Sequence, residues 1–239
     1  MDKLIYLLWG LKDQSREERR ETLLRGCAPQ LLEAGAAKLT MYIADPDSKM
    51  RSSAPIHKGE RICAEVSLWV DSIDRREPLE TILRSAGFRV HGYLVDECLY
   101  TEYGDNRHAK PRDWPDGQRS PGVVAVTLLE RPKRLSHDEW IKRWHGRQSP
   151  TASEMQPQAR YIRNTVIRPV TEGAPPFEGI AEEVWPSKRH VTNPFLFYDA
   201  GKNPFKLAWN MTRMLRSVRF FLDIHLVRTT MMSEYIVKS

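Results

Sequence analysis

The segment from Ser136 to His145 could place two indole rings and an imidazole on one helix. At helical spacing Trp140 and Trp144 share one face, and Ile141 and His145 share the next. An imidazole has a pKa close to neutrality, so His145 at the edge of an aromatic wall could take and give a proton. A histidine that packs on Trp144 and bonds water is the alternative. The residue types alone leave both interpretations open.

Two glutamates, Glu65 and Glu183, stand at matching places in the similar segments ICAEV, residues 62–66, and IAEEV, residues 180–184. Because side chains alternate along a strand, the apolar neighbours of Glu65 would face the helices, and both glutamates would point between two sheets. By the same alternation Glu182 would face the other way. We therefore expect Glu65 and Glu183, rather than Glu182, to reach an interior space.

A carboxylate between two sheets is costly unless it is paired, and its pKa is often raised. A pair with an arginine such as Arg163 is the structural interpretation, and it stands equal to a catalytic one. Two histidines, His91 and His225, follow a β-branched residue in the two fourth strands and would face the same interior. For each histidine alone, a hydrogen bond to a neighbouring backbone group is the simpler interpretation.

The elements that would position these residues occur twice along the chain, as an internal repeat. In each copy a capping box, Ser15-x-x-Glu18 or Ser136-x-x-Glu139, follows an apolar strand and starts a helix. The apolar pattern predicts the strands of the first copy at about 3–9, 38–44, 62–70 and 89–100. The second copy repeats this order from residue 123, with strands at 123–129 and 159–170, and carries an extra helical insertion at 191–222.

These patterns predict an α+β fold, two tandem ferredoxin-like βαββαβ units packed sheet to sheet as a pseudo-dimeric α+β barrel. The first unit would span residues 1–104, a Pro- and Gly-rich linker 105–121, and the second unit 122–239. A sheet with both helices on one face leaves its other face bare, and two such sheets cover each other. The space between them would hold a small ligand. The insertion 191–222 has apolar positions almost all round its main helix, so it would cover one mouth of the barrel.

Three segments of the second copy together resemble the EthD family. They are Trp144-His145 at the end of the first helix, Tyr161-Ile-Arg-Asn164 in the next strand, and the run PPFEGIAEEVW at 175–185. The first copy lacks the Trp-His element. The resemblance implies a ferredoxin-like dimeric barrel, and relatives include cofactor-free decarboxylases, dehydratases and cyclases that act on polyketide-like or aromatic compounds.

The residues and the resemblance together predict a cofactor-independent lyase or isomerase that moves a proton on an aromatic or polyketide-like molecule in the barrel cavity. His145 would be the general acid or base, with Glu183 as its electrostatic partner. Tyr161 and Asn164 would donate hydrogen bonds to a developing oxyanion. The remaining residues that we expect around the substrate are Trp144, Trp185, Glu65, His91 and His225. The alternative is a non-catalytic carrier of a hydrophobic metabolite, which would not need His145 and Glu183 in one cavity.

The overall composition limits which binding partners, cellular locations and cofactors we expect for the protein. The net charge is +6, but basic residues are dispersed and mixed with acids, so no nucleic-acid partner is expected. No apolar stretch approaches the roughly 20 residues of a membrane-spanning helix, and the first residues do not have the form of a secretory signal. Three widely spaced cysteines favour a reducing cytoplasm. No cofactor or metal motif is present, so none is expected, and a homodimer of the tandem units is compatible with the fold.

Overall fold

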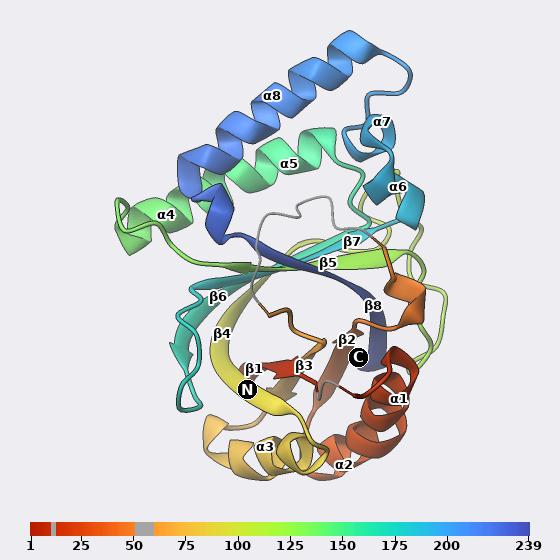
Figure 1. Ribbon diagram of the computed structural model, residues 1–239, viewed down its shortest axis with the longest axis vertical. Coiled ribbons are helices and arrows are strands. Elements are labelled where there is room, and N and C mark those ends of the chain that lie inside the picture. Colours follow the sequence, from red (N-terminus) through yellow and green to blue (C-terminus); the bar gives the residue numbers. More distant parts are fainter. Residues whose placement is uncertain (11–12, 51–59) are drawn as a thin grey trace.

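Eight antiparallel strands form one closed barrel in the computed structural model, which describes residues 1–10, 13–50 and 60–239 (Figure 1). Around the barrel the strands follow the order β1-β3-β2-β8-β5-β7-β6-β4, and β4 pairs with β1 to close the circle. Closure gives each of these eight strands a hydrogen-bonded neighbour on both sides.

The strands are β1 (Asp2–Trp9), β2 (Lys38–Ile43), β3 (Ala64–Val70), β4 (Arg89–Thr101), β5 (Val123–Leu129), β6 (Arg160–Pro169), β7 (Gly179–Trp185) and β8 (Arg228–Lys238). The α-helices are α1 (Arg16–Glu21), α2 (Ala28–Glu33), α3 (Arg76–Ser85), α4 (His137–Arg143), α5 (Ser149–Met155), α6 (Lys188–Thr192), α7 (Pro194–Phe197) and α8 (Pro204–Phe221). Both predicted capping serines, Ser15 and Ser136, accept a hydrogen bond from the backbone of the third helical residue.

Each half of the chain contributes one continuous half of the barrel. Strands β1–β4 stand in the order β4-β1-β3-β2, and strands β5–β8 stand in the equivalent order β8-β5-β7-β6. The halves are joined by hydrogen-bonded pairs of β2 with β8 and of β4 with β6. The sequence predicted two sheets packed face to face. The structure instead pairs their edges, which satisfies the edge backbone groups and encloses one shared interior.

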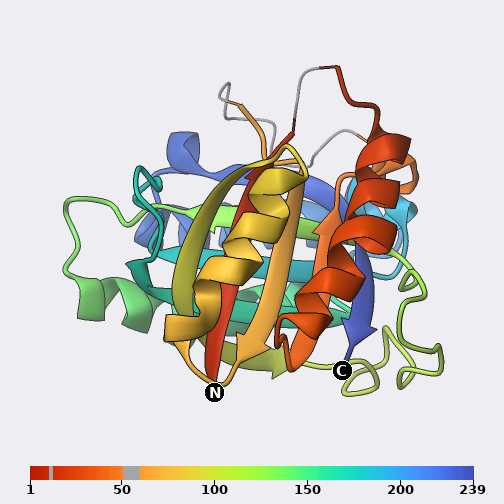
Figure 2. The same ribbon diagram turned by 90° about the horizontal axis from the view of Figure 1, so that it is seen from below.

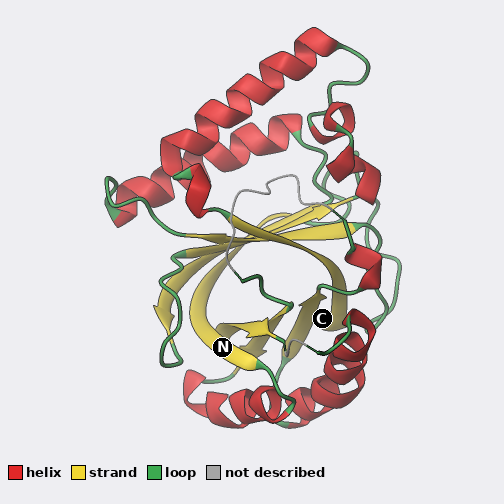
Figure 3. Ribbon diagram, viewed as in Figure 1, coloured by secondary structure: helices red, strands yellow, loops and turns green. Residues whose placement is uncertain are grey.

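The alternation of side chains along β1 shows how the barrel divides its apolar residues. Ile5 and Leu7 pack inside the barrel, whereas Leu4 and Leu8 pack outward with the helices of the first half. Figure 2 shows these helices lying across the outer face of β1–β4, and Figure 3 shows helices on two opposite sides of the barrel. Because both faces of the sheet are buried, most strands carry apolar residues on both faces, with a few buried polar residues such as Lys3 and Glu182 on the inner face.

The first helix of each half is interrupted by a π-helical segment, η1 (Thr22–Cys27) or η4 (Trp144–Gln148). A proline, Pro29 or Pro150, follows each segment after one intervening residue. Proline lacks the N–H of a helical hydrogen bond and crowds the carbonyl four residues before it. The helix widens instead, and the residue after each segment donates its N–H to the carbonyl five residues back. In the second half this wide, π-helical turn, η4, begins at Trp144.

The helical insertion of the second half is present but covers a different surface from the predicted one. It forms α6, α7 and α8, and Asn203 caps α8 by accepting from two backbone N–H groups, as its position before Pro204 predicted. The insertion packs over the outer face of β5–β8 together with α4 and α5 (Figure 1). The prediction that it closes a mouth of the barrel was wrong, because its buried apolar residues, such as Met214 and Phe221, meet helices and the outer sheet face.

The last strand starts later than the sequence indicated. Residues Ile224–Leu226 form a short 3-10 turn, and β8 begins at Arg228. His225 therefore does not lie in a strand, and the predicted match between His91 and His225 was wrong. The segment between the halves runs beside β8, where Ser120 donates its backbone N–H to the carbonyl of Glu234.

Candidate active site

Two consecutive glutamates on β7 point to opposite sides of the sheet. Ile180 packs inside the barrel and Ala181 packs outside it, so by alternation Glu182 points inward and Glu183 points outward toward the helices. The predictions that Glu183 reaches the space between the sheets and that Glu182 does not were both wrong. Glu65 does point inward. The letters of the two segments align Glu65 with Glu183, but the barrel matches it with Glu182, and a shift of one residue reverses the face.

The outer face of β5–β7 is the floor of a cavity of about 300 Å³. Its roof comes from η4, α7 and α8, and the α8 residues that line it are Met214, Leu215, Val218 and Phe221. Leu215 is 46% exposed, so the cavity reaches the molecular surface beside α8. Four residues that the sequence predicted for the site also line this cavity: Trp144, Tyr161, Glu183 and Trp185. We call it the outer cavity.

Among the described residues that line the outer cavity, Glu183 carries the one carboxyl group. It is half-buried, and one of its oxygens accepts a hydrogen bond of 2.6 Å from Nε2 of Gln158. Burial raises the pKa of Glu183 from 4.5 to about 7, against the opposing effect of the Gln158 amide. A carboxyl group with a pKa near neutrality can both take and give a proton, which is the property required of a general acid or base.

Tyr161 lies directly opposite Glu183 on the neighbouring strand, but its hydroxyl group is already engaged. It accepts from Nε1 of Trp144 at 3.2 Å and lies 3.2 Å from Oγ of Ser149. Ser149 Oγ donates its proton to the carbonyl of Trp144 at 3.1 Å, so Tyr161 must be the donor toward Ser149. Tyr161 therefore fixes the wide turn of η4 against the sheet and has no proton left for an oxyanion.

His145 follows Trp144 in the chain but is not among the residues that line the outer cavity. Its ring packs edge-on against Trp144 at 4.8 Å between centroids, and its carbonyl accepts from Arg163 at 3.3 Å. Nε2 of His145 is buried without a hydrogen-bond partner among the described residues. Burial, together with the positive charge of Arg163, lowers the pKa of His145 to about 4, so the imidazole is neutral at pH 7. The structure thus does not bring His145 and Glu183 together in one cavity.

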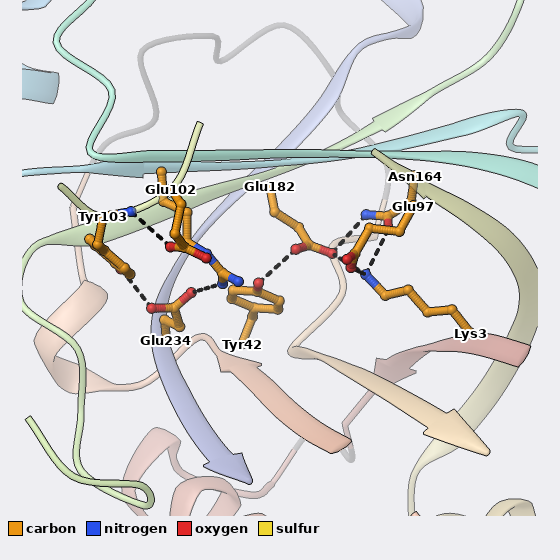
Figure 4. A network of polar contacts seen from close by, with 9 residues as sticks. Lys3, Tyr42, Glu97, Glu102, Tyr103, Asn164, Glu182 and Glu234 are labelled. Carbon is orange, nitrogen blue, oxygen red and sulfur yellow. Dashed lines mark hydrogen bonds and ion pairs between the residues drawn. The ribbon is translucent and has the colours of Figure 1, made fainter. Parts of the chain in front are cut away.

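Asn164 points into the barrel, on the face opposite to Tyr161, since the two positions differ by an odd number of residues. Its Nδ2 donates to Glu182 at 2.8 Å, and its Oδ1 accepts from Nζ of Lys3 at 2.7 Å (Figure 4). Tyr42 donates to the other oxygen of Glu182 at 2.6 Å, and Lys3 also pairs with Glu97. The expected pair of Tyr161 and Asn164 at one oxyanion was wrong for this geometric reason.

The interior glutamates form a coupled pair. Burial, and then the neighbouring carboxylate of Glu182, raises the pKa of Glu65 well above its ordinary value. Burial opposes ionisation of Glu182 as well, but the charge of Lys3 and the hydrogen bond from Tyr42 hold its pKa below its ordinary value. Glu65 is therefore the neutral member of the pair and Glu182 the ionised one. Both oxygens of Glu65 are buried without a hydrogen-bond partner among the described residues. The predicted partner of a buried glutamate, Arg163, lies outside the barrel, where it contacts Cys98.

The barrel interior opens at one end into a cavity of about 570 Å³, which Lys3, Tyr42 and Glu182 line together with other polar residues. The same region contains Glu234, which accepts from Tyr103 at 2.6 Å and from Arg160 at 2.9 Å (Figure 4). The charges of Lys3, Glu182 and Glu234 are matched by opposite charges and hydrogen bonds, whereas Glu183 in the outer cavity has one amide partner. Glu65 lacks a partner within the described part of the chain, but it does not line the interior cavity. The outer cavity is therefore the better candidate for acid–base chemistry.

The two remaining histidines of the prediction lie away from the outer cavity. His91 packs edge-on against Trp9 at 5.3 Å between ring centroids, toward the interior of the barrel. Burial, and then the charge of Arg89, lowers its pKa. His225 is exposed in the 3-10 turn before β8 and does not line the outer cavity. Neither histidine is placed to contact a ligand beside Glu183.

Some residues in and beside the outer cavity could not be recognised from the sequence. Gln158 lies just before β6 and donates to Glu183 on β7. In the roof of the cavity, Nε2 of Gln148 donates to the sulfur of Met214 at 3.3 Å. Polar amides next to a strand are common, so their type did not identify them. Met214 lies within the predicted insertion, but only the packing of α8 on η4 shows which space it closes.

Among the described residues no group of histidine, cysteine, aspartate and glutamate side chains has an arrangement that could hold a metal ion. Over the same residues we find no helix with the length and apolar character needed to span a bilayer.

No protein-family model and no curated protein sequence matches the chain. Solved structures do. An anthrone oxidase-like protein aligns with a TM-score of 0.59 at 10% identity, over 100% of this chain and 94% of its own. A protein of Fusobacterium nucleatum subsp. nucleatum, provisionally assigned as a monooxygenase, aligns with a TM-score of 0.51 at 8% identity, over 99% of this chain and 92% of its own. The chain shares the fold of these structures, a closed barrel with helices on its outer side. At these identities the similarity establishes the fold alone, and the chemistry must be argued from the site.

Proposed function

We propose that the protein is a small-molecule enzyme that transfers a proton to or from an apolar, aromatic or polyketide-like substrate in the outer cavity. Glu183 is the general acid or base. The observation that carries this proposal is a single carboxyl group with a pKa of about 7 in a largely apolar cavity of about 300 Å³. Perturbed carboxyl groups in concave apolar sites are the usual mark of acid–base catalysis.

The chemistry follows from the charge state of Glu183. As a carboxylate it accepts a proton from an acidic C–H or O–H group of the substrate, leaving an enolate or phenolate. The neutral acid then returns the proton to another atom, which gives an isomerisation, or protonates a leaving group, which gives an elimination. The Gln158 amide donates to one oxygen of Glu183 and so fixes the orientation of the carboxyl group.

The walls of the cavity favour a flat, apolar substrate. Trp144 is 1% exposed and Trp185 is 2% exposed, and both line the cavity. Phe197 stacks on Trp185 with ring centroids 4.6 Å apart and an angle of 17° between the rings. Aromatic walls fixed in this way bind aromatic rings at little cost in side-chain entropy. The volume is at the lower end of that of small-molecule sites, which suits a compact ring system.

Two finer interpretations accompany this proposal. One is membership of the EthD family, which the segments around Trp144, Tyr161 and Gly179 support. The other is an origin of the chain by duplication of one ferredoxin-like unit, which the equal strand order and the equivalent π-helical segments of both halves support. In this proposal only the second half carries the catalytic cavity.

A second candidate reaction is oxygenation, which the fold similarity to an anthrone oxidase-like protein and to a provisional monooxygenase favours. Removal of a proton by Glu183 would generate an electron-rich carbanion or phenolate, which is also the form of an aromatic substrate that reacts with molecular oxygen. The first chemical step is thus the same for a lyase, an isomerase and such an oxygenase. A non-catalytic carrier remains the alternative from another class.

Solvent-deuterium exchange tests the shared step directly. The protein is incubated in D₂O with anthrone and with related phenols, and the incorporation of deuterium at the acidic carbon is followed by NMR, with oxygen consumption recorded in parallel. We expect exchange above the uncatalysed rate in the wild type and a loss of about 100-fold or more in Glu183→Gln. A carrier would bind these molecules without exchange, and binding that is equal in Glu183→Gln with no exchange in either protein would overturn the proposal.

A further inference from the structure

A further cavity lies in the groove between η4–α5 and α8, with a volume of about 380 Å³. Five residues line it: Arg147, Thr151, Arg213, Arg216 and Ser217. Figure 1 shows α5 and α8 side by side above the barrel, and the two helices are in contact. We call these five residues the arginine groove. None of them lines the outer cavity.

The charges of the arginine groove are incompletely matched. Arg213 pairs with Glu154 at 2.7 Å, whereas Arg147 and Arg216 make no side-chain hydrogen bond or ion pair with the described residues. Arg147 instead lies over the ring of Phe220, 4.2 Å from its centroid. No acidic residue occurs within α8 to balance its arginines. Three guanidinium groups around one hollow are held together most favourably by an anion.

An independent observation concerns Ser217. It is 4% exposed, and its hydroxyl oxygen has no hydrogen-bond partner among the described residues. A buried hydroxyl group without a partner costs stability, and a serine in a helix usually avoids this cost by donating to the carbonyl four residues back. Ser217 lines the groove, so a ligand there would supply the missing acceptor.

We propose that the arginine groove binds a phosphate group. The groove offers the planar donor pairs of Arg147, Arg213 and Arg216 and the hydroxyl groups of Thr151 and Ser217. A tetrahedral dianion with several acceptor oxygens matches so many donors better than a single carboxylate does. The phosphate could belong to a soluble phosphate ester or to a lipid headgroup, and the experiment separates the two sources.

The contact between Gln148 and Met214 lies between the arginine groove and the outer cavity. Gln148 and Met214, which follow Arg147 and Arg213 in the chain, meet at 3.3 Å and line the outer cavity. A phosphate in the groove would therefore fix the same turns of η4 and α8 that roof the cavity. The binding site itself does not depend on the proposed acid–base function, and its test uses no enzymatic activity.

The test measures binding of inorganic phosphate and pyrophosphate by calorimetry, and binding of phosphatidylcholine vesicles with and without phosphatidylglycerol by sedimentation. We expect the double variant Arg147→Gln/Arg216→Gln to weaken binding about 10-fold or more, since each lost charge-assisted hydrogen bond contributes a substantial share of the affinity. Ser217→Ala should weaken binding while leaving the unliganded protein as stable as the wild type or more so. Glu154→Gln should strengthen binding, because it frees Arg213 from its ion pair.

The matched control is Arg75→Gln, an exposed arginine in the other half of the barrel. Binding of the soluble anions with the expected variant effects supports a phosphate ester, and binding of phosphatidylglycerol vesicles alone with the same effects supports a headgroup. No binding of either probe overturns the proposal. If Arg75→Gln weakens binding as much per removed charge as the double variant does, the proposal is also overturned, because this would show attraction by net charge alone.

Discussion

Glu182 and Glu183 are neighbours on β7, yet their carboxyl groups serve two different environments. Glu182 accepts hydrogen bonds from Tyr42 and Asn164 inside the barrel, and Glu183 faces the outer cavity with Gln158 as its partner. The pKa of Glu182 is lowered and that of Glu183 is raised to about 7. One strand therefore provides an ionised structural carboxylate and a titratable one, separated by the thickness of the sheet.

The pH dependence of catalysis should report Glu183. If the carboxylate is the base, kcat/KM rises with pH and levels off above about pH 7, because the fraction ionised follows the pKa of about 7. The measurement is a pH profile of deuterium exchange or turnover. Glu183→Asp keeps a carboxyl group and should retain a shifted profile at reduced rate, whereas Glu183→Gln should be inactive at every pH. An unchanged profile in Glu183→Asp would assign the titration to another group.

The same pKa shift predicts a stability change with a definite sign. The folded protein holds the proton of Glu183 more tightly than the unfolded chain does, so between about pH 4.5 and pH 7 its contribution to stability falls as the pH rises. Glu183→Gln removes this effect. Urea unfolding should show the variant more stable than the wild type by roughly 1 to 3 kcal/mol at pH 8 and nearly equal at pH 4.5. A difference that is the same at both pH values would contradict the raised pKa.

His145 should be dispensable for proton transfer. Its pKa of about 4 makes it neutral at pH 7, and it does not line the cavity that holds Glu183. His145→Gln should therefore keep turnover within about threefold of the wild type, compared with the usual loss of 100-fold or more for a general acid or base. The comparison needs circular dichroism spectra to confirm the fold of each variant. A loss in His145→Gln as large as that in Glu183→Gln would restore the histidine to the mechanism.

The interior pair should respond unequally to removal of its two carboxyl groups. Glu65 is the neutral member, so Glu65→Gln replaces an acid by an amide of the same shape and should change the free energy of unfolding by less than about 1 kcal/mol at pH 7. Glu182→Gln removes the charge that faces Lys3 and disturbs two hydrogen bonds, which should cost about 2 to 4 kcal/mol. Chemical denaturation of both variants measures the difference. Equal losses would mean that the proton is not held on Glu65.

Gly179 at the start of β7 supports the aromatic wall. A Cβ atom there would lie 2.7 Å from the ring of Trp144 and 2.9 Å from that of Trp140. Gly179→Ala should therefore destabilise the fold by about 1 to 3 kcal/mol and move Trp144, with a change in tryptophan fluorescence. Gly146→Ala is the matched control, because a Cβ atom at that helical position would have no neighbour within 4 Å. The control should be neutral or slightly stabilising.

The sequence by itself determined the elements and much of the aromatic wall. The capping serines and the apolar periodicity are local signals, and they placed the helix of Trp140 and Trp144 and most strands correctly. It also showed that the two halves repeat the same order. Trp144, Tyr161, Glu183 and Trp185 were all selected, and all line one cavity.

Only the tertiary structure decided on which side of the sheet each strand residue lies. The outer face of β7 is covered by helices and its inner face by the barrel, so both faces are apolar and no polar alternation marks them. An alignment by residue letters then erred by one position, which exchanged the roles of Glu182 and Glu183. The outer cavity depends on contacts between α8, η4 and the sheet, which lie far apart in sequence. The pKa of Glu183 is set by that burial, and burial is a property of packing that no single segment contains.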